Sequence, residues 1–292
     1  MEVRTIAVIG AGTMGRAIAY AAAFGGYQTV LEDISPRVLE QATAWIRRSF
    51  EEEVARGKVE AGVRERALGL LSTATDVKDA IRDAELIIEA VPEELEMKLE
   101  LFTIFDKFAK TGAIFASNTS SLSITDFTDV TVSRDRCIGM HFFNPAPKVK
   151  LVELVRTRHT SEDTVDVCRE VARRMGKEVV LVNEAPGFIT THVNALIGNE
   201  AFDMLQAGIA TVEDIDKALK LGLNHPMGPF ELVDLVGLDV RLNILEYLHS
   251  TLGEKYRPNE LLCQYVKEGR LGRKSGRGVY DYTKQKATEK KA

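Results

Sequence analysis

A glycine cluster between a β-prone run and a helical run is the feature that most constrains the fold of this chain. The cluster, Gly10-Ala11-Gly12-Thr13-Met14-Gly15, follows the apolar run Thr5–Ile9 and opens the alanine-rich run Arg16–Phe24. A second strand-like run, Thr29–Asp33, ends in an acidic residue about 20 residues beyond the cluster. This order predicts parallel strands joined by a helix, with the glycines in the turn between the first strand and the helix.

The residue types in the cluster are those that a dinucleotide-binding turn needs. Gly10 would form the tight turn, Gly12 would let the backbone approach a pyrophosphate, and Gly15 would let the helix pack closely on the strand. Thr13 and Met14 complete the loop at a helix N-terminus, where the helix dipole favours an anion. A glycine-rich turn without a ligand is the alternative interpretation.

The residues at the end of the second strand bear on which dinucleotide would bind. The Asp33 carboxylate would accept hydrogen bonds from an adenosine ribose and would repel a 2′-phosphate. Glu32 adds a second acidic residue, and the pair therefore favours NAD over NADP. The basic residue Arg37 lies close by and keeps NADP open as the less favoured cofactor.

The first part of the chain continues to alternate strand-like and helical runs. The helical runs are Ser35–Arg56, which enters through Ser35-Pro36 as cap and first turn, and Glu93–Lys110. The further strand-like runs are Leu86–Ala90, Ala113–Ser117, Cys137–His141, Leu151–Val155 and Glu178–Val182. We therefore predict an α/β domain over residues 1–185, a Rossmann-type, doubly wound and mostly parallel sheet covered by helices.

The pattern changes at Pro186-Gly187, after which no alternating strand follows. Helical runs follow instead, at Ile189–Ala207, Val212–Leu221, Pro229–Leu235, Val240–Leu252 and Asn259–Glu268. An all-α C-terminal domain over residues 186–292 is therefore predicted. The closing polar segment, Lys284–Ala292, is expected to fray.

The composition restricts the partners and the compartment. The chain has 292 residues, of which 45% are hydrophobic and 28% charged, as in an ordinary globular protein. Its net charge of -5 gives no field that would favour nucleic acid or an anionic membrane surface. Three cysteines without a CxxC pair indicate reduced thiols, so we expect a cytoplasmic protein. Because neither a leader, a membrane-length apolar run nor a metal-ligand spacing is found, we expect no membrane anchor and no metal.

A histidine and a glutamate stand out in two successive strand-like runs. His141 ends the run Cys137–His141, which places it at the carboxyl edge of the sheet, where open α/β sheets bind ligands. Glu153 is the one charged residue within the apolar run Leu151–Val155, and its burial would require a partner. A carboxylate bonded to an imidazole fixes the tautomer and raises the basicity of the ring, as an acid/base residue needs. A polar core histidine and a surface-facing Glu153 are the alternatives.

Longer motifs give the chain a resemblance to a known family. The motifs are Gly10–Gly15, Ser117-Asn118-Thr119-Ser120-Ser121-Leu122, His141-Phe142-Phe143-Asn144-Pro145, Lys150–Val155, Pro186-Gly187-Phe188, His225–Asp239 and Lys274–Tyr282. With these motifs, which span nearly the whole chain, it resembles the 3-hydroxyacyl-CoA dehydrogenases, especially the bacterial 3-hydroxybutyryl-CoA dehydrogenases. The resemblance implies an NAD-dependent oxidoreductase of fatty-acid metabolism (β-oxidation) that interconverts (S)-3-hydroxyacyl-CoA and 3-oxoacyl-CoA, with short-chain 3-hydroxybutyryl-CoA as the expected substrate. It also implies a homodimer.

The resemblance also assigns roles to residues. His141 would be the general acid/base, and Glu153 would orient it. The residues expected beside the acyl-CoA substrate are Ser120, Asn144, Arg56, Lys58 and Thr191. The residues expected around the cofactor, besides the glycine cluster and Asp33, are Glu93, Lys98, Asn118 and Lys274.

The chain departs from the family pattern at two adjacent positions. After Pro186-Gly187-Phe188-Ile189 the family usually presents an Asn followed by an Arg, and Thr191 and His192 stand at those positions here. A Thr hydroxyl is shorter than a carboxamide and lacks its two N–H donors. We therefore expect either a water or Asn194, which lies three residues on and roughly on the same helix face, to replace the missing contact.

Two other interpretations keep the fold and change the function. The chain could be a dehydrogenase of a 3-hydroxy acid without CoA, of the gulonate or carnitine type. It could also be an NAD-binding sensor or structural protein, which would be expected to have lost the acid/base pair. Both His141 and Glu153 are present, which favours an enzyme.

Overall fold

The computed structural model of the protein describes residues 1–283, and the predicted fraying of Lys284–Ala292 lies outside the described residues. The chain divides into two compact units, Met1–Phe188 and a second unit that begins at Ile189. Each unit has its own hydrophobic core, as expected of a domain.

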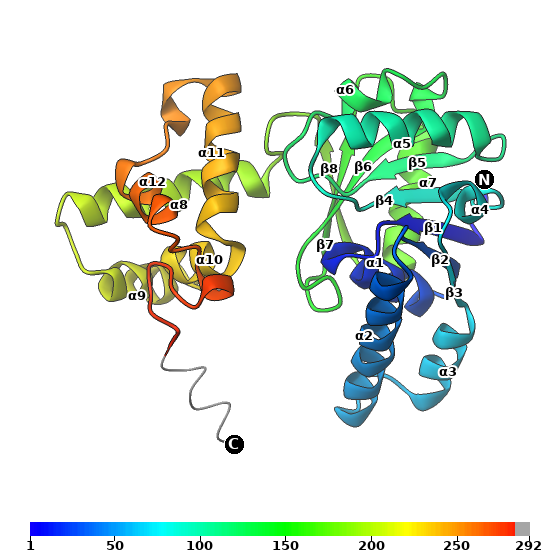
Figure 1. Ribbon diagram of the computed structural model, residues 1–292, viewed down its shortest axis with the longest axis horizontal. Coiled ribbons are helices and arrows are strands. Elements are labelled where there is room, and N and C mark those ends of the chain that lie inside the picture. The colour runs from blue at the N-terminus through cyan, green and yellow to red at the C-terminus, as the bar shows by residue number, and fades with distance from the viewer. Residues whose placement is uncertain (284–292) are drawn as a thin grey trace. The chain divides into compact units, whose positions relative to one another are not determined.

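The first unit is built on one eight-stranded sheet within the described residues (Figure 1). The strands lie in the order β3-β2-β1-β4-β5-β6-β7-β8, and every neighbouring pair is parallel except β6 with β7. Their bounds are β1 Thr5–Ile9, β2 Gln28–Glu32, β3 Leu71–Ala74, β4 Leu86–Glu89, β5 Ile114–Ser117, β6 Cys137–Phe142, β7 Leu151–Arg156 and β8 Glu178–Asn183. The predicted Rossmann-type, mostly parallel sheet is confirmed.

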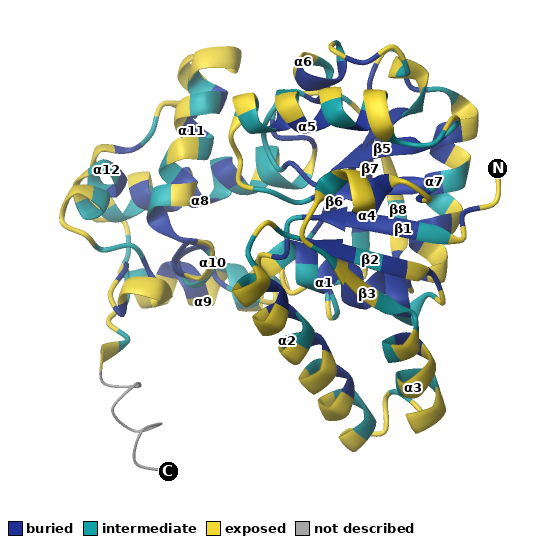
Figure 2. Cartoon of the chain, turned by 45° about the vertical axis from the view of Figure 1, so that its right-hand side comes forward, coloured by how far each residue is buried: buried dark blue, intermediate teal, exposed yellow. Residues whose placement is uncertain are grey.

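Alternate side chains of the strands feed two separate cores on the two faces of the sheet. In β1, Ile6 and Val8 belong to one core and Ala7 and Ile9 to the other. The first core packs against α1 Thr13–Phe24, α2 Pro36–Ala55, α3 Ala61–Gly69 and α7 Glu162–Arg174. The second packs against α4 Val77–Ile81, α5 Leu95–Phe108 and α6 Ile124–Thr128. Figure 2 shows the consequence in the middle of the sheet, where buried strands are covered by helices with exposed outer faces.

Several elements were not predicted because their sequence signals are weak. Strand β3, Leu-Ser-Thr-Ala, is short and only partly buried, so it shows no apolar alternation. Helices α4 and α6 have five residues each, too few for a helical period to stand out. The predicted cap at Ser35 is confirmed, since its hydroxyl accepts from the Val38 N–H at 3.4 Å at the start of α2.

The second unit is helical over its described residues, and the predicted helical runs match the observed helices closely. The helices are α8 Thr190–Gln206, α9 Val212–Gly222, α10 Pro229–Val236, α11 Leu238–Leu252 and α12 Glu260–Lys267. Buried Asp234 of α10 accepts hydrogen bonds from the backbone N–H groups of Val279 and Tyr280 and from the Tyr282 hydroxyl, at 2.7 to 2.9 Å. These bonds fasten the segment Lys274–Tyr282 to α10.

The cysteines of the described chain, Cys137, Cys168 and Cys263, are free thiols. Burial raises the pKa of Cys137 and of Cys168 to about 12, which keeps both thiols protonated and unreactive. Within residues 1–283, none of the helices combines the length and the apolar character needed to cross a bilayer.

Candidate active site

The glycine cluster forms an open turn between β1 and α1. Gly10 has a φ of +93°, and a Cβ on it would lie 2.9 Å from the Ala90 carbonyl oxygen. A Cβ on Gly15 would lie 1.7 Å from the Gly10 carbonyl oxygen, whereas one on Gly12 would meet no heavy atom within 4 Å. Close packing thus requires a glycine at Gly10 and at Gly15, whereas Gly12 leaves open space at the start of α1.

This turn fits a dinucleotide pyrophosphate. Gly12 is the N-cap of α1, and no side chain among residues 1–283 caps the first turn of the helix. Those N–H groups and the helix dipole are free to bind a negatively charged group above Gly12. Asp33 lies beside the turn, where its carboxylate accepts from the N–H groups of Ala11 and Ser35, both at 3.0 Å.

His141 and Glu153 face each other across the β6–β7 pair. The two residues are direct partners in the antiparallel register, and His141 Nδ1 lies 2.8 Å from Glu153 Oε2. Their side chains are only 5% and 1% exposed. Because a carboxylate only accepts, the Nδ1 nitrogen carries the proton in this bond, and Nε2 remains for proton exchange. The rings of Phe143 and Phe188 pack at centroid distances of 4.4 and 5.7 Å from the imidazole.

A buried ion pair lies at the ends of β4 and β5. Lys98 Nζ donates to both carboxylate oxygens of Glu89 at 2.7 and 2.8 Å, and Glu89 Oε2 also accepts from the Ser117 hydroxyl at 2.6 Å. The Lys98 and Glu89 side chains are 1% and 0% exposed. Glu89 was not singled out from the sequence, although it is the charged end of the apolar run Leu86–Glu89. Like Glu153, it is a charged residue in an apolar run, and its burial requires a partner.

The same lysine extends the network to Glu93, at 3.3 Å. Glu93 Oε1 accepts from the Thr119 hydroxyl at 2.5 Å and from the N–H groups of Ser120 and Ser121 at 3.0 and 3.1 Å. Burial raises the pKa of Glu93, but Lys98 and these hydrogen bonds outweigh it and hold the pKa below its usual value. An ionised Glu93 therefore fixes the loop that carries Ser120.

Asn118 connects this loop to the histidine strand. Its backbone N–H donates to the Glu89 carbonyl oxygen at 2.8 Å, and its Oδ1 accepts from the Phe142 N–H at 2.9 Å. The structure thus brings Asn118, Ser120, Glu93 and Lys98 together near His141 at the carboxyl edge.

The other predicted site residues of the first unit, Asn144, Arg56 and Lys58, are exposed. Asn144 is exposed and precedes a cis bond to Pro145. Arg56 lies at the far end of α2, which begins at the carboxyl edge and is about 30 Å long. It forms ion pairs with Glu52 and Glu53 at 3.5 and 3.0 Å.

Lys58 is exposed just beyond Arg56. The remaining predicted residues belong to the second unit. Thr191 lies in the first turn of α8, and Lys274 pairs with Asp239 at 2.6 Å.

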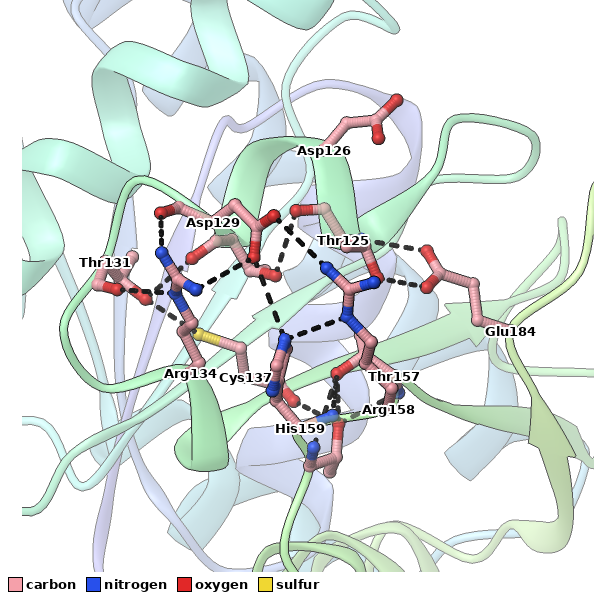
Figure 3. Close-up of polar contacts among 12 residues, drawn as sticks. Thr125, Asp126, Asp129, Thr131, Arg134, Cys137, Thr157, Arg158, His159 and Glu184 are labelled. Atoms are coloured by element: carbon pink, nitrogen blue, oxygen red, sulfur yellow. Dashed lines mark hydrogen bonds and ion pairs between the residues drawn. The ribbon is translucent and has the colours of Figure 1, made fainter.

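A second polar cluster lies at the opposite end of β6 from His141 (Figure 3). Glu184 accepts from the Thr125 N–H at 2.8 Å and from the Ser123 hydroxyl at 3.2 Å at the start of α6. At the end of α6, Asp129 pairs with Arg134 at 3.5 Å and Arg158 at 3.7 Å. These contacts hold α6, the helix that follows the Ser120 loop.

Comparison with known proteins decides the family. Residues 5–185 match the sequence model of the 3-hydroxyacyl-CoA dehydrogenase NAD-binding domain, and residues 187–282 match that of the C-terminal domain of the same enzymes. The chain belongs to the 3-hydroxyacyl-CoA dehydrogenase family. The predicted family, its oxidoreductase class and NAD as the cofactor of the first domain are thereby confirmed.

Individual members of the family match over nearly their whole length. A probable 3-hydroxybutyryl-CoA dehydrogenase of Bacillus subtilis is 43% identical, covering 97% of this chain and 98% of the relative. The crystal structure of (S)-3-hydroxybutyryl-CoA dehydrogenase PaaH1 from Ralstonia eutropha has a TM-score of 0.93 at 39% identity, covering 97% of this chain and all of that one. FadB2 of M. tuberculosis has a TM-score of 0.92 at 40% identity with the same coverage.

Proposed function

We propose that the protein interconverts (S)-3-hydroxyacyl-CoA and 3-oxoacyl-CoA with NAD, and that its substrate is short, 3-hydroxybutyryl-CoA. The observation that carries this proposal is the buried His141–Glu153 pair at the same sheet edge as the glycine turn. The names of the similar proteins support the substrate class.

The pair suits acid/base chemistry on a hydroxyl group. Bound NAD supplies the acceptor for the hydride that leaves C3 of the substrate. Nε2 of neutral His141 takes the proton of the 3-hydroxyl, and Glu153 stabilises the imidazolium that forms. In reduction the imidazolium returns the proton to the developing alkoxide. Acid/base assistance of this kind contributes about 10²- to 10⁴-fold to the rate.

The neighbouring residues would position the reactants. Ser120, on the loop held by Glu93, would bind the oxygen of the substrate. Asn118, Glu93, Lys98 and Lys274 would surround the nicotinamide half of the cofactor. Because the Lys98 ammonium is buried between two carboxylates, it would act on the cofactor side through Glu93. Asn144 and Thr191 would line the acyl end.

Arg56 and Lys58 would bind the phosphates of CoA at the far end of α2. Arg56 would first have to release Glu52 and Glu53. We further propose residues 1–185 as the NAD-binding domain and 186–292 as the helical domain for substrate binding and dimerisation, in a cytoplasmic enzyme. A solution mass near 32.3 kDa rather than twice that value would reject the homodimer.

A series of 3-oxoacyl-CoA substrates from four carbons upward, assayed with NADH, tests the function. We expect the greatest kcat/KM at four carbons and little activity with NADPH. Gulonate and carnitine, assayed with NAD, serve as the competing substrates. Turnover of either at a rate that exceeds every acyl-CoA would reject the proposal.

A further inference from the structure

Two buried glutamates end the strands on either side of β1, and within residues 1–283 only one of them has a counter-charge. Glu32 ends β2 and Glu89 ends β4, and both are register partners of Ile9 on β1. Side chains that pair across parallel strands point to the same face, so the two carboxyl groups share the α4–α5 face of the sheet. Lys98 neutralises Glu89, whereas Glu32 forms no ion pair with any residue between 1 and 283.

The surroundings of Glu32 are acidic. The residue is 2% exposed, and no hydrogen bond reaches its Oε1 atom from the described residues. Asp33 follows it directly in the chain, and Asp76 faces it from the start of α4, while the Gly10 N–H favours a negative charge on it. Burial first, and then Asp33 and Asp76, raise the pKa of Glu32 to about 7.

Glu32 is also part of the dinucleotide turn. Its backbone carbonyl accepts from the Gly10 N–H at 2.9 Å, and the next residue, Asp33, holds the Ala11 N–H. A dinucleotide that binds at this turn brings the negative pyrophosphate to the edge and displaces water from it. Both changes oppose a charge on Glu32.

We propose that Glu32 is a proton-linked binding residue of the NAD site: it takes up a proton from solvent when the dinucleotide binds and is a neutral carboxylic acid in the complex. In that form its carboxyl group can donate a hydrogen bond, which a carboxylate cannot do. Binding of the cofactor therefore consumes a proton, and NADH affinity depends on pH. The proposal requires only that NAD binds to the first domain, so it stands or falls independently of the acyl-CoA substrate.

The direction of the pH dependence follows from linkage. Below about pH 7 Glu32 is already protonated in the free protein, and pH has no effect on affinity through this residue. Above that pH a proton must be taken up on binding, so the affinity for NADH falls by up to about tenfold per pH unit. We expect the loss to continue until the pH reaches the raised pKa of Glu32 in the complex.

Calorimetry and indicator dyes test the proton directly. NADH is mixed with the protein at about pH 7.5 in weak buffer, and the proton uptake is measured. The Kd for NADH is measured at that pH and between about pH 6 and 8.5. Wild type should take up a fraction of a proton for each NADH bound. Its affinity for NADH should weaken several-fold as the pH rises. Glu32→Gln, which stays neutral, should lose that uptake and the part of the pH dependence that Glu32 causes.

Two further variants separate this result from a general charge effect. Asp76→Asn keeps a capping side chain at α4 but removes one repelling charge, so the affinity should begin to fall at a lower pH. Asp83→Asn removes an equal charge from an exposed position, and its affinity for NADH should depend on pH as in wild type. Equal proton uptake in wild type and Glu32→Gln would overturn the proposal, as would an unshifted Asp76→Asn curve.

The melting temperature, measured without cofactor, tests the proposal if Glu32→Gln folds poorly. A raised native pKa favours the protonated native state, so the stability that Glu32 contributes is present at low pH and is lost between about pH 4.5 and 7. The melting temperature of wild type relative to Asp76→Asn should therefore fall between about pH 5 and 8. A difference in melting temperature between the two proteins that stays constant with pH would contradict the acidic environment assigned to Glu32.

Discussion

Three buried carboxylates show how the partner of a residue decides its role. Glu153 faces an imidazole, Glu89 faces an ammonium group, and Glu32 faces other acids. The first suits proton transfer, the second suits fixed structure, and the third suits a group that changes its protonation on binding. The sequence identified Glu153 because it interrupts an apolar run, but no sequence pattern indicates which partner a buried acid will meet.

At the residue scale, substitutions can test the effect of Thr191, which stands where the family usually has an Asn. Thr191 and Asn194 are both half-buried near the start of α8, and His192 next to Thr191 bonds the Tyr256 hydroxyl. We expect Thr191→Asn to keep or raise kcat, because a carboxamide restores the longer side chain with two donors. Asn194→Ala should lower kcat if Asn194 has taken over the contact. The measurement is steady-state turnover of acetoacetyl-CoA.

The outcomes of these two variants distinguish the explanations. A neutral Asn194→Ala would leave a water as the replacement. A Thr191→Asn protein that folds and binds NADH but loses most of its activity would mean that the pocket differs from that of the family. The choice of substrate would then have to be made again.

At the element scale, the register of β6 and β7 brings the proposed catalytic pair together. The sequence predicted both strands and both residues, but it did not predict that the strands run antiparallel. In that register His141 and Glu153 are direct neighbours, which a parallel crossover would not ensure. Strand identity could be predicted from apolar runs, while pairing depends on turn geometry and packing that a single sequence does not display.

The Glu89–Lys98 pair leads to a prediction about stability at the same scale. Glu89→Gln leaves a buried ammonium with only Glu93 nearby, and we expect a loss of about 3–5 kcal/mol in the free energy of unfolding. Glu89→Gln combined with Lys98→Met removes both charges and should recover much of that loss. Urea unfolding measures both variants.

An exposed ion pair provides the control. Asp79 and Arg82 of the first unit are 62% and 68% exposed, and Asp79→Asn should change stability by less than about 1 kcal/mol. If Glu89→Gln were as mild as this control, the buried Glu89–Lys98 pair would not stabilise the first unit as expected.

At the scale of the whole molecule, the motif Pro186-Gly187-Phe188 has a local structural role. Gly187 has a φ of +72°, which a glycine adopts readily, and Phe188 then packs on the His141 ring. The first unit ends at Phe188, so the chain leaves it beside the ring of His141. The change in sequence pattern indicated this junction, but the contact between Phe188 and His141 required the structure.

The long-range polar contacts could not be predicted from the sequence for a related reason. Asp234 bonds residues 279, 280 and 282, and Glu93 bonds residues 119 to 121. Such contacts depend on which loops meet after folding, and no local period encodes them. The glycine turn, in contrast, was predictable because its geometry is determined by residues that are adjacent in the chain.

The most direct test of the account compares turnover and NADH binding in His141→Gln. Without a proton acceptor at Nε2 the rate should fall by about 10²- to 10⁴-fold, while the Kd for NADH changes little. His159→Gln, the same substitution at the other end of β6, should leave both values near wild type. A His141→Gln enzyme that keeps more than about a tenth of the wild-type rate would contradict the role of His141 as the acid/base residue.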